Sequence, residues 1–434
     1  MRIPILALIF LAACGGGCRQ RPDADTSEPF GPEEYGSLPG LRATPNLKLR
    51  DELARIVEEG GTPEQLSKVA TGDEKNAAVV LRELFPRQQV KSLLEASAAI
   101  FPPREFTFDP IRLEKAINFR KKYEPERQQA GEALQRPQCA FGIRFTAGFC
   151  ADLGFVDIVR LCGRLEAFQA AESLFEDNVT AAIESFSRMM RLASCLAAEQ
   201  HPVPRLEAAQ LRSEAFRVLQ AIVQHERMSR QNLGQLCDLV SGQLAAWPSD
   251  ASAWIGDRAL GLHAYEMVRR GQMLQLLTDK EGEQFRQENS LAELSDAAQR
   301  SVDQDELYYL ETMRKIIGCC NQPFYARFAV FEAMDNDLRQ REDTAGYPLV
   351  AARLLLPEIR QGHEAQARDR ANWQAWALAL ALATGRDAAA YKANPLSAKD
   401  YTQIKQDGLV VVKGIGTAGG GDDSPILVPI PASP

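Results

Sequence analysis

The sequence predicts a mainly α-helical protein, an irregular stack of helical hairpins that ends in a small β-hairpin module. Apolar residues recur at helical spacing from about Leu47 to about Thr384, whereas short β-prone runs around an Asp-Gly turn occur only after residue 385. The chain has 434 residues and is 45% hydrophobic. Because one compact core stops growing well below this length, we expect two domains or an extended stack of helices.

The first residues have the layout of a secretory signal peptide. Arg2 supplies a basic start, and the apolar run from Ile3 to Ala13 is too short to span a bilayer. Leu11-Ala12-Ala13-Cys14 resembles a bacterial lipobox. The resemblance implies that Cys14 becomes the first mature residue and carries acyl chains, and two or more such chains anchor a protein stably to a membrane.

The helical part begins with clear local signals. Thr62-Pro63-Glu64-Gln65 combines a capping residue, a proline at the first helical position and a glutamine that can cap in return. Pro102-Pro103 and the β-prone Phe106-Thr107-Phe108 interrupt the helical pattern, and another helix is expected from about Pro110 to Tyr123.

The clearest periodicity lies between Phe155 and Ala197, where two apolar stripes flank the polar break Glu176-Asp177-Asn178. We expect two antiparallel helices with Asn178 as a helix cap, in a hairpin that resembles a degenerate tetratricopeptide-like unit. Further apolar stripes follow over 309–320 and 324–338, and their aromatic residues are expected in the core.

The C-terminal end changes character. Tyr401–Lys405 and Leu409–Val412 flank Asp407-Gly408, which is a strong two-residue hairpin signal. Ile426–Ile430 can add a third strand, and its proline at position 429 confines that strand to a sheet edge.

The expected organisation follows from these patterns and from composition. Residues 14–45 are rich in Gly, Pro, Asp, Glu and Ser, so they predict a flexible tether. The expected divisions are a signal peptide at 1–13, the tether at 14–45, an N-terminal helical region at 46–150, a helical-hairpin domain at 151–384, and a β-hairpin with a Gly/Asp-rich tail at 385–434.

Charge and motifs exclude several classes of function. The 58 acidic and 50 basic residues give a net charge of -8 without a basic block, which argues against a nucleic-acid partner. Gly414–Gly419 spells Gly-x-Gly-x-x-Gly, but no helix can open after it to hold a dinucleotide. His363 and His225 each precede a glutamate but lack the second histidine of a zinc protease, and the four histidines are expected at the surface.

Nine cysteines are present, and eight remain after Cys14. An exported chain meets an oxidising compartment, so disulfides are possible, with buried free thiols as the alternative. Folding a hairpin about Asp177 brings Cys162 within about a turn of Cys195, and Cys139 and Cys150 bracket a short glycine-containing loop. These two pairs are the disulfide candidates.

Three segments are similar to parts of uncharacterised helical lipoproteins from planctomycete-type bacteria, and the likeness runs over most of residues 73–430. The resemblance supplies no activity. The similar segments are Arg136–Phe141, Gly256–Leu262, and Leu355–Pro357 followed by Glu364–Arg368.

The tail from Asn394-Pro395-Leu396 to Asp422-Asp423 is similar in layout to the end of type II secretion pseudopilins, in which an acidic loop can hold calcium. Asp422 and Asp423 are therefore candidate calcium ligands beside glycine carbonyls, and a solvated turn is the alternative. The chain lacks a long apolar pilin helix at its N-terminus, which argues against pilus assembly.

We therefore expect a lipid-anchored envelope scaffold, on the periplasmic face of the outer membrane, whose helices bind a protein or peptide partner. An extracytoplasmic hydrolase with paired carboxylates and an accessory part of an envelope secretion or pilus-like system are the alternatives. A scaffold predicts a broad groove, and a hydrolase predicts a compact pocket with clustered polar groups and shifted pKa values.

Overall fold

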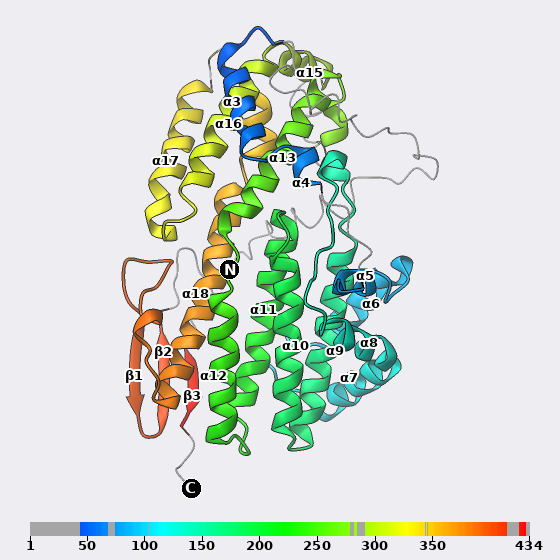
Figure 1. The fold of residues 1–434 in the computed structure, drawn as a ribbon, viewed down its shortest axis with the longest axis vertical. Helices are drawn as coiled ribbons and strands as arrows, with labels where there is room; N and C mark the ends of the chain where they lie inside the picture. Colours follow the sequence, from blue (N-terminus) through cyan, green and yellow to red (C-terminus); the bar gives the residue numbers. More distant parts are fainter. Residues whose placement is uncertain are drawn as a thin grey trace.

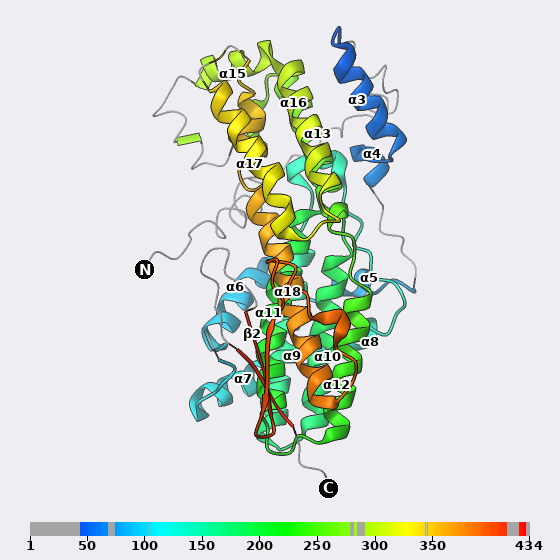
Figure 2. The ribbon, with the colours of Figure 1, turned by 90° about the vertical axis from the view of Figure 1, so that its left-hand side faces the viewer.

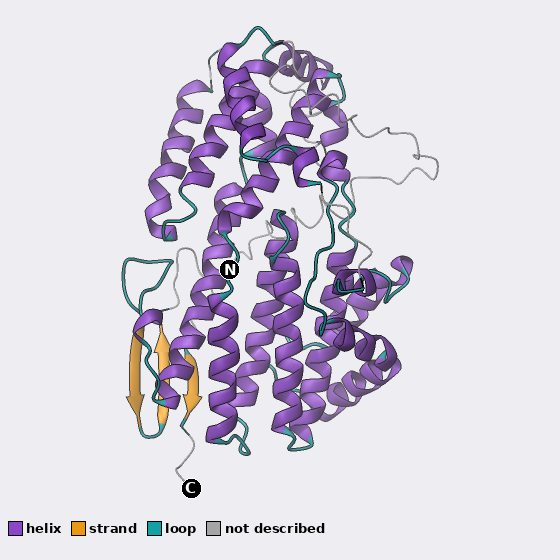
Figure 3. Ribbon diagram, viewed as in Figure 1, coloured by secondary structure: helices purple, strands orange, loops and turns teal. Residues whose placement is uncertain are grey.

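The structure is a computed structural model that describes residues 44–67, 74–103, 105–277, 282–283, 291–342, 344, 346–414 and 425–430. Most of these residues are helical, and a three-stranded antiparallel sheet lies near the C-terminus (Figure 3). The predicted mainly α fold with a C-terminal β module is therefore confirmed. Cys14, Asp422 and Asp423 lie outside the described residues.

The molecule is elongated, with a lower and an upper group of helices (Figures 1 and 2). Four long helices form the centre of the lower bundle: α9 (Phe155–Phe175), α10 (Val179–Ala197), α11 (Pro202–Val223) and α12 (Arg230–Ala245). Shorter helices cover one side of it: α5 (Ala77–Leu81), α6 (Arg87–Ile100), α7 (Pro110–Lys122) and α8 (Glu124–Ala133).

The upper bundle comprises α3 (Leu47–Glu58), α4 (Pro63–Leu66), α13 (Asp250–Arg269), α15 (Leu291–Arg300), α16 (Val302–Gly318) and α17 (Phe324–Arg341). Short helical turns connect longer elements: η1 (Phe145–Cys150), η2 (Met273–Leu276), η3 (Ala351–Leu355) and η4 (Ala389–Tyr391). Each bundle has its own hydrophobic core, although Leu66 of α4 and Ala259 and Leu260 of α13 pack in the lower one.

The longest helix, α18 (Ile359–Thr384), joins the two cores. Ile359 near its start packs in the upper core, whereas Trp373 and Trp376 pack in the lower core. The Trp376 ring stacks on Phe216 of α11, with 6.0 Å between the ring centroids. The helix ends at a left-handed Gly385 with φ of 74°, a common helix stop.

The helices between residues 46 and 150 contribute to both cores. The residues of α3 pack in the upper core, while α5 to α8 pack in the lower core with α9 to α12. The N-terminal helical residues therefore do not share one core, because α3 reaches across to α16 of the upper bundle.

The C-terminal sheet has the strand order β1 (Thr402–Gln406), β2 (Leu409–Lys413), β3 (Ile426–Pro429). Asp407 and Gly408 both have positive φ, 51° and 74°, so the predicted two-residue hairpin turn is confirmed. Pro429 lies in edge strand β3, as expected. The side chain of Gln220 in α11 donates a hydrogen bond to the Leu427 carbonyl of β3 at 2.8 Å.

Local predictions in the helical part were confirmed at three places. Thr62 and Gln65 form the capping box, Asn178 caps α10 through the Ala181 amide at 3.1 Å, and α9 with α10 forms the expected antiparallel hairpin. The β-prone Phe106-Thr107-Phe108 forms no strand in the described chain. The rings of Phe106 and Phe108 instead pack on each other, and that of Phe108 also packs on Phe168 of α9.

Candidate functional site

The structure forms neither of the two expected disulfides. Cys139, Cys150, Cys162 and Cys195 are all free thiols, and Cys150 is exposed. The neighbouring thiol that raises the pKa of Cys139 is that of Cys195. Cys162 is fully buried in α9, and burial raises the pKa of its thiol.

The histidines are placed differently from the expected surface positions. His201, His263 and His363 are buried, and burial lowers their pKa values to about 3, 4 and 3. The His363 ring stacks on Trp254 at 4.2 Å between centroids, so this residue is a neutral core side chain. Sequence reasoning missed the burial of His363 because its stacking partner, Trp254, is distant in the chain.

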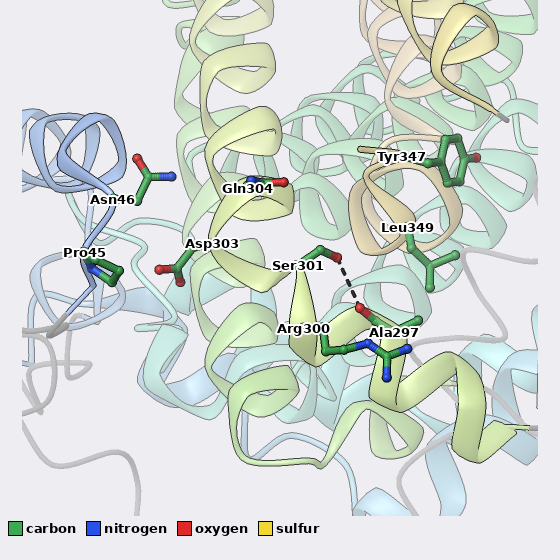
Figure 4. Close-up of a pocket in the computed structure, with 9 residues that line it drawn as sticks. All are labelled: Pro45, Asn46, Ala297, Arg300, Ser301, Asp303, Gln304, Tyr347 and Leu349. Atoms are coloured by element: carbon green, nitrogen blue, oxygen red, sulfur yellow. Dashed lines mark hydrogen bonds between the residues drawn. The ribbon is translucent and has the colours of Figure 1, made fainter. Parts of the chain in front are cut away.

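The larger cavity, with a volume of about 900 Å³, opens at the top of the upper bundle, and we call it the upper cavity. Figure 4 shows Pro45 and Asn46 on one side of the junction between α15 and α16, and Tyr347 and Leu349 on the other. The remaining lining residues belong to the junction itself: Ala297, Arg300, Ser301, Asp303 and Gln304.

Buried hydrogen bonds hold the walls of the upper cavity in place. The carboxylate of Asp305, buried in α16, accepts from the Tyr265 hydroxyl at 2.5 Å and from the amides of Val350 and Ala351 at 2.8 and 2.9 Å. Burial raises the pKa of Asp305 despite these three donors. Through these bonds α16 fixes the segment that carries Tyr347 and Leu349.

The opposite wall is held by Asp303. Its carboxylate pairs with Arg269 at 2.6 Å and accepts a hydrogen bond from Thr44, whose hydroxyl also accepts from the Asn46 amide at 3.1 Å. This network fixes Pro45 and Asn46 against α16. Sequence reasoning missed it because Thr44 and Asp303 are 259 residues apart.

Arg300 is the charged group that the upper cavity offers to a ligand. It is the last residue of α15, it is exposed, and it makes no ion pair with any residue that the structure describes. A guanidinium presents several donors that match a carboxylate. Tyr347 and Leu349 add half-buried apolar surface nearby, so the cavity can contact both an acidic and an apolar group.

A smaller cavity of about 300 Å³ lies where the two bundles meet, between the starts of α13 and α17, the middle of α18 and residues 393–400. Asp250 and Asp400 line it, and they are the carboxylates that a hydrolase could use. Both oxygens of Asp250 are already occupied, however, by Arg205 at 3.1 Å and Arg327 at 3.1 Å, with Trp247 donating at 3.0 Å.

The electrostatics of Asp250 do not suit a general acid. Burial would raise the pKa of this carboxyl, but the Trp247 hydrogen bond and the charges of Arg205 and Arg327 outweigh it and hold the pKa below its ordinary value. A general acid needs a raised pKa to stay protonated near neutral pH. Asp250 is therefore the counter-ion of two buried guanidiniums.

The described residues contain no group of three or more His, Cys, Asp or Glu side chains that could hold a metal ion. Over the same part of the chain, every helix falls short of the length and apolar character that a bilayer crossing demands. No family model, curated protein or solved structure matches this chain.

Proposed function

We propose that this protein is a lipid-anchored component of a bacterial cell envelope, and that it binds a protein or peptide partner in the upper cavity. The observation that carries the binding proposal is the open cavity of about 900 Å³ that the exposed Arg300 lines together with Tyr347 and Leu349. Arginine and aromatic residues are enriched where protein partners bind tightly.

The chemistry of the cavity defines the partner. Arg300 favours a carboxylate, from an acidic side chain or a chain terminus, while Leu349 and Pro45 favour a neighbouring apolar side chain. The partner segment is therefore acidic and apolar at adjacent positions. A broad groove of this kind fits a binding scaffold better than a hydrolase, in which a carboxyl of raised pKa would line the cavity. Asp305, the carboxyl of raised pKa in the cavity wall, is instead buried behind the lining and accepts from three donors.

The anchor part of the proposal rests on the lipobox-like Leu11–Cys14. The described chain starts at Thr44, beside the upper cavity, and roughly 30 residues separate it from Cys14. A chain of that length spans at most about 100 Å. The bound partner would therefore lie within about that distance of the membrane surface.

The binding part is tested by Arg300→Glu, with Arg230→Glu as the matched control. Arg230 is also an exposed arginine, but it starts α12 in the lower bundle. We expect affinity-tagged protein from detergent-solubilised envelope to lose its co-purifying partner in Arg300→Glu and to keep it in Arg230→Glu. Equal recovery from both variants, with unchanged melting temperatures, would reject the upper cavity as the binding site.

The anchor part is tested by Cys14→Ser, which removes the sulfur that acyl chains would modify. We expect this variant to be unprocessed or to leave the membrane fraction, because no thioether-linked chain remains. Mature Cys14→Ser protein that stays in the membrane fraction as completely as the native chain would contradict the anchor.

A further inference from the structure

Two cysteines that are distant in the chain meet where the segment after α8 crosses the end of α10. Cys195 lies in the last turn of α10, within the lower core. Cys139 lies in the extended segment between α8 and η1, and it packs against the same core. Both cysteines thus pack at the same hydrophobic core, and the neighbouring Cys195 thiol raises the pKa of Cys139.

The backbone on one side of Cys139 is fixed to α10. The amide of Phe141 donates to the carboxylate of Glu199 at 2.6 Å, and Glu199 follows Cys195 by four residues, which is about one helical turn. Two extended residues cover about the same distance as that turn, roughly 6 to 7 Å. With residue 141 held at residue 199, residue 139 therefore lies beside residue 195.

The backbone around Cys139 is also clamped from the other side. The Asn76 side chain donates to the Ala140 carbonyl at 2.9 Å and accepts from the Ala140 amide at 3.0 Å. The Phe141 ring stacks on Phe155 at 4.1 Å between centroids. The position of Cys139 against α10 is thus set by several contacts that do not involve either sulfur.

We propose that Cys139 and Cys195 form a disulfide bond in the exported protein. The oxidant is a disulfide-bearing thiol oxidant of the envelope. The Cys139 thiolate attacks the disulfide of the oxidant and forms a mixed disulfide. The Cys195 sulfur then displaces the oxidant. One S–S bond forms in this chain and one breaks in the oxidant, which leaves as a dithiol with the two thiol protons.

The accessibility of the two sulfurs fits this order of steps. Cys139 is half-buried and can be reached from solvent, whereas Cys195 is buried and can react only with a neighbour. Contact with Cys195 and burial both raise the pKa of the Cys139 thiol. Because the thiolate is the attacking species, the folded dithiol should react slowly with weak oxidants, and exchange during folding is the faster route.

Trypsin separates the cysteines concerned, which makes the pairing directly readable. Cleavage after lysine and arginine, except before proline, puts Cys139 in peptide 128–144, Cys150 in 145–160, Cys162 in 161–164 and Cys195 in 192–205. The test isolates the full chain from the cell envelope, blocks thiols with N-ethylmaleimide without reductant, and maps the peptides by mass spectrometry.

We expect peptide 128–144 linked to peptide 192–205, with 161–164 recovered as a blocked thiol. The proposal is overturned if peptides 128–144 and 192–205 are both recovered as blocked thiols from envelope-isolated protein. That conclusion would hold even if oxidised glutathione could link the two peptides in purified protein. Linkage of 128–144 to 145–160, or of 161–164 to 192–205, would overturn it as well.

Melting temperatures provide a second readout. Cys139→Ser, Cys195→Ser and the double variant remove the same bond, so all three should melt several degrees lower than the native chain and by nearly equal amounts. Cys150→Ser, at an exposed position, is the control and should melt like the native chain. Additive losses in the double variant would show two independent thiols and would overturn the proposal.

Discussion

Neutralising Asp250 should destabilise the junction between the two bundles. Asp250 is the first residue of α13, and its side chain is 3% exposed. Arg205 of α11 and Arg327 of α17, which are 1% and 3% exposed, both donate to it. The same carboxylate thus connects helices of the lower and upper bundles, and Asp250→Asn removes its charge with little change in size.

The expected loss follows from what remains buried. In Asp250→Asn, Arg205 still donates hydrogen bonds to the carbonyls of Ala197 and Pro248, both at 2.7 Å. Arg327 still donates to the carbonyls of Cys320 and Gln322. Their hydrogen bonds are therefore largely retained, but two guanidinium charges lose their counter-ion. Removing one partner of a buried ion pair typically costs about 3–5 kcal/mol, so we expect a loss of that size.

Urea unfolding followed by circular dichroism measures this loss, with Asp152→Asn as the control. Asp152 pairs with Arg87 at 2.6 Å, but both side chains are largely exposed, so that variant should lose only about 0–1 kcal/mol. If Asp250→Asn lost no more unfolding free energy than Asp152→Asn, the Asp250 carboxylate would not compensate the charges of the buried arginines. That result would refute the reasoning.

The pH dependence gives an independent check on Asp250. The pKa of Asp250 is lower in the folded chain than in the unfolded chain. Its contribution to the free energy of unfolding is therefore complete above the unfolded pKa and is lost as the pH falls through the folded pKa. The difference in unfolding free energy between the native chain and Asp250→Asn should therefore be constant at neutral pH and shrink below about pH 4.

Three further predictions concern other parts of the molecule. The pKa of His363 is lowered to about 3, so only the unfolded chain binds its proton between pH 6.5 and 5, and stability should fall by about 2 kcal/mol for this histidine over that interval. His363→Phe should reduce the pH slope of the unfolding free energy by one proton, and an unchanged slope would contradict the burial of a neutral ring. Gly256→Ala should lower the melting temperature strongly, because its Cβ would lie 1.7 Å from the Gln200 carbonyl oxygen, whereas Gly242→Ala in α12 meets no atom within 4 Å and should gain up to about 1 kcal/mol. Equal shifts in the two variants would contradict the close approach. If Asp422 and Asp423 bind calcium, millimolar calcium should raise the melting temperature of the native chain but not that of Asp422→Ala/Asp423→Ala, and a titration without heat would leave the loop as a turn.

The parts of the fold that were predictable from sequence depend on neighbouring residues. The Thr62 capping box, the Asn178 cap and the Asp407-Gly408 turn each involve contacts within a few positions, so the residue types suffice to indicate them. The α9–α10 hairpin followed from helical periodicity on both sides of a short polar break.

The candidate site was not predictable for the opposite reason. Asp305 reaches the Val350 amide across 45 positions, and Thr44 reaches Asp303 across 259. Nothing in the periodicity of one helix indicates which distant helix covers it. The burial of His363 against Trp254 was missed in the same way. The approach of Cys139 to Cys195 was missed because spacing along the chain favoured Cys150 and Cys162 as their partners.

Photocrosslinking tests the central claim, partner binding at the upper cavity, most directly. A benzophenone-bearing phenylalanine replaces Tyr347 in the cavity or, as control, Phe175, which is 74% exposed at the end of α9 in the lower bundle. In illuminated cells we predict a discrete crosslinked product at position 347 that disappears when Arg300→Glu is added, and no such product at position 175. A product at 347 that Arg300→Glu leaves unchanged, or the same product at both positions, would contradict the account.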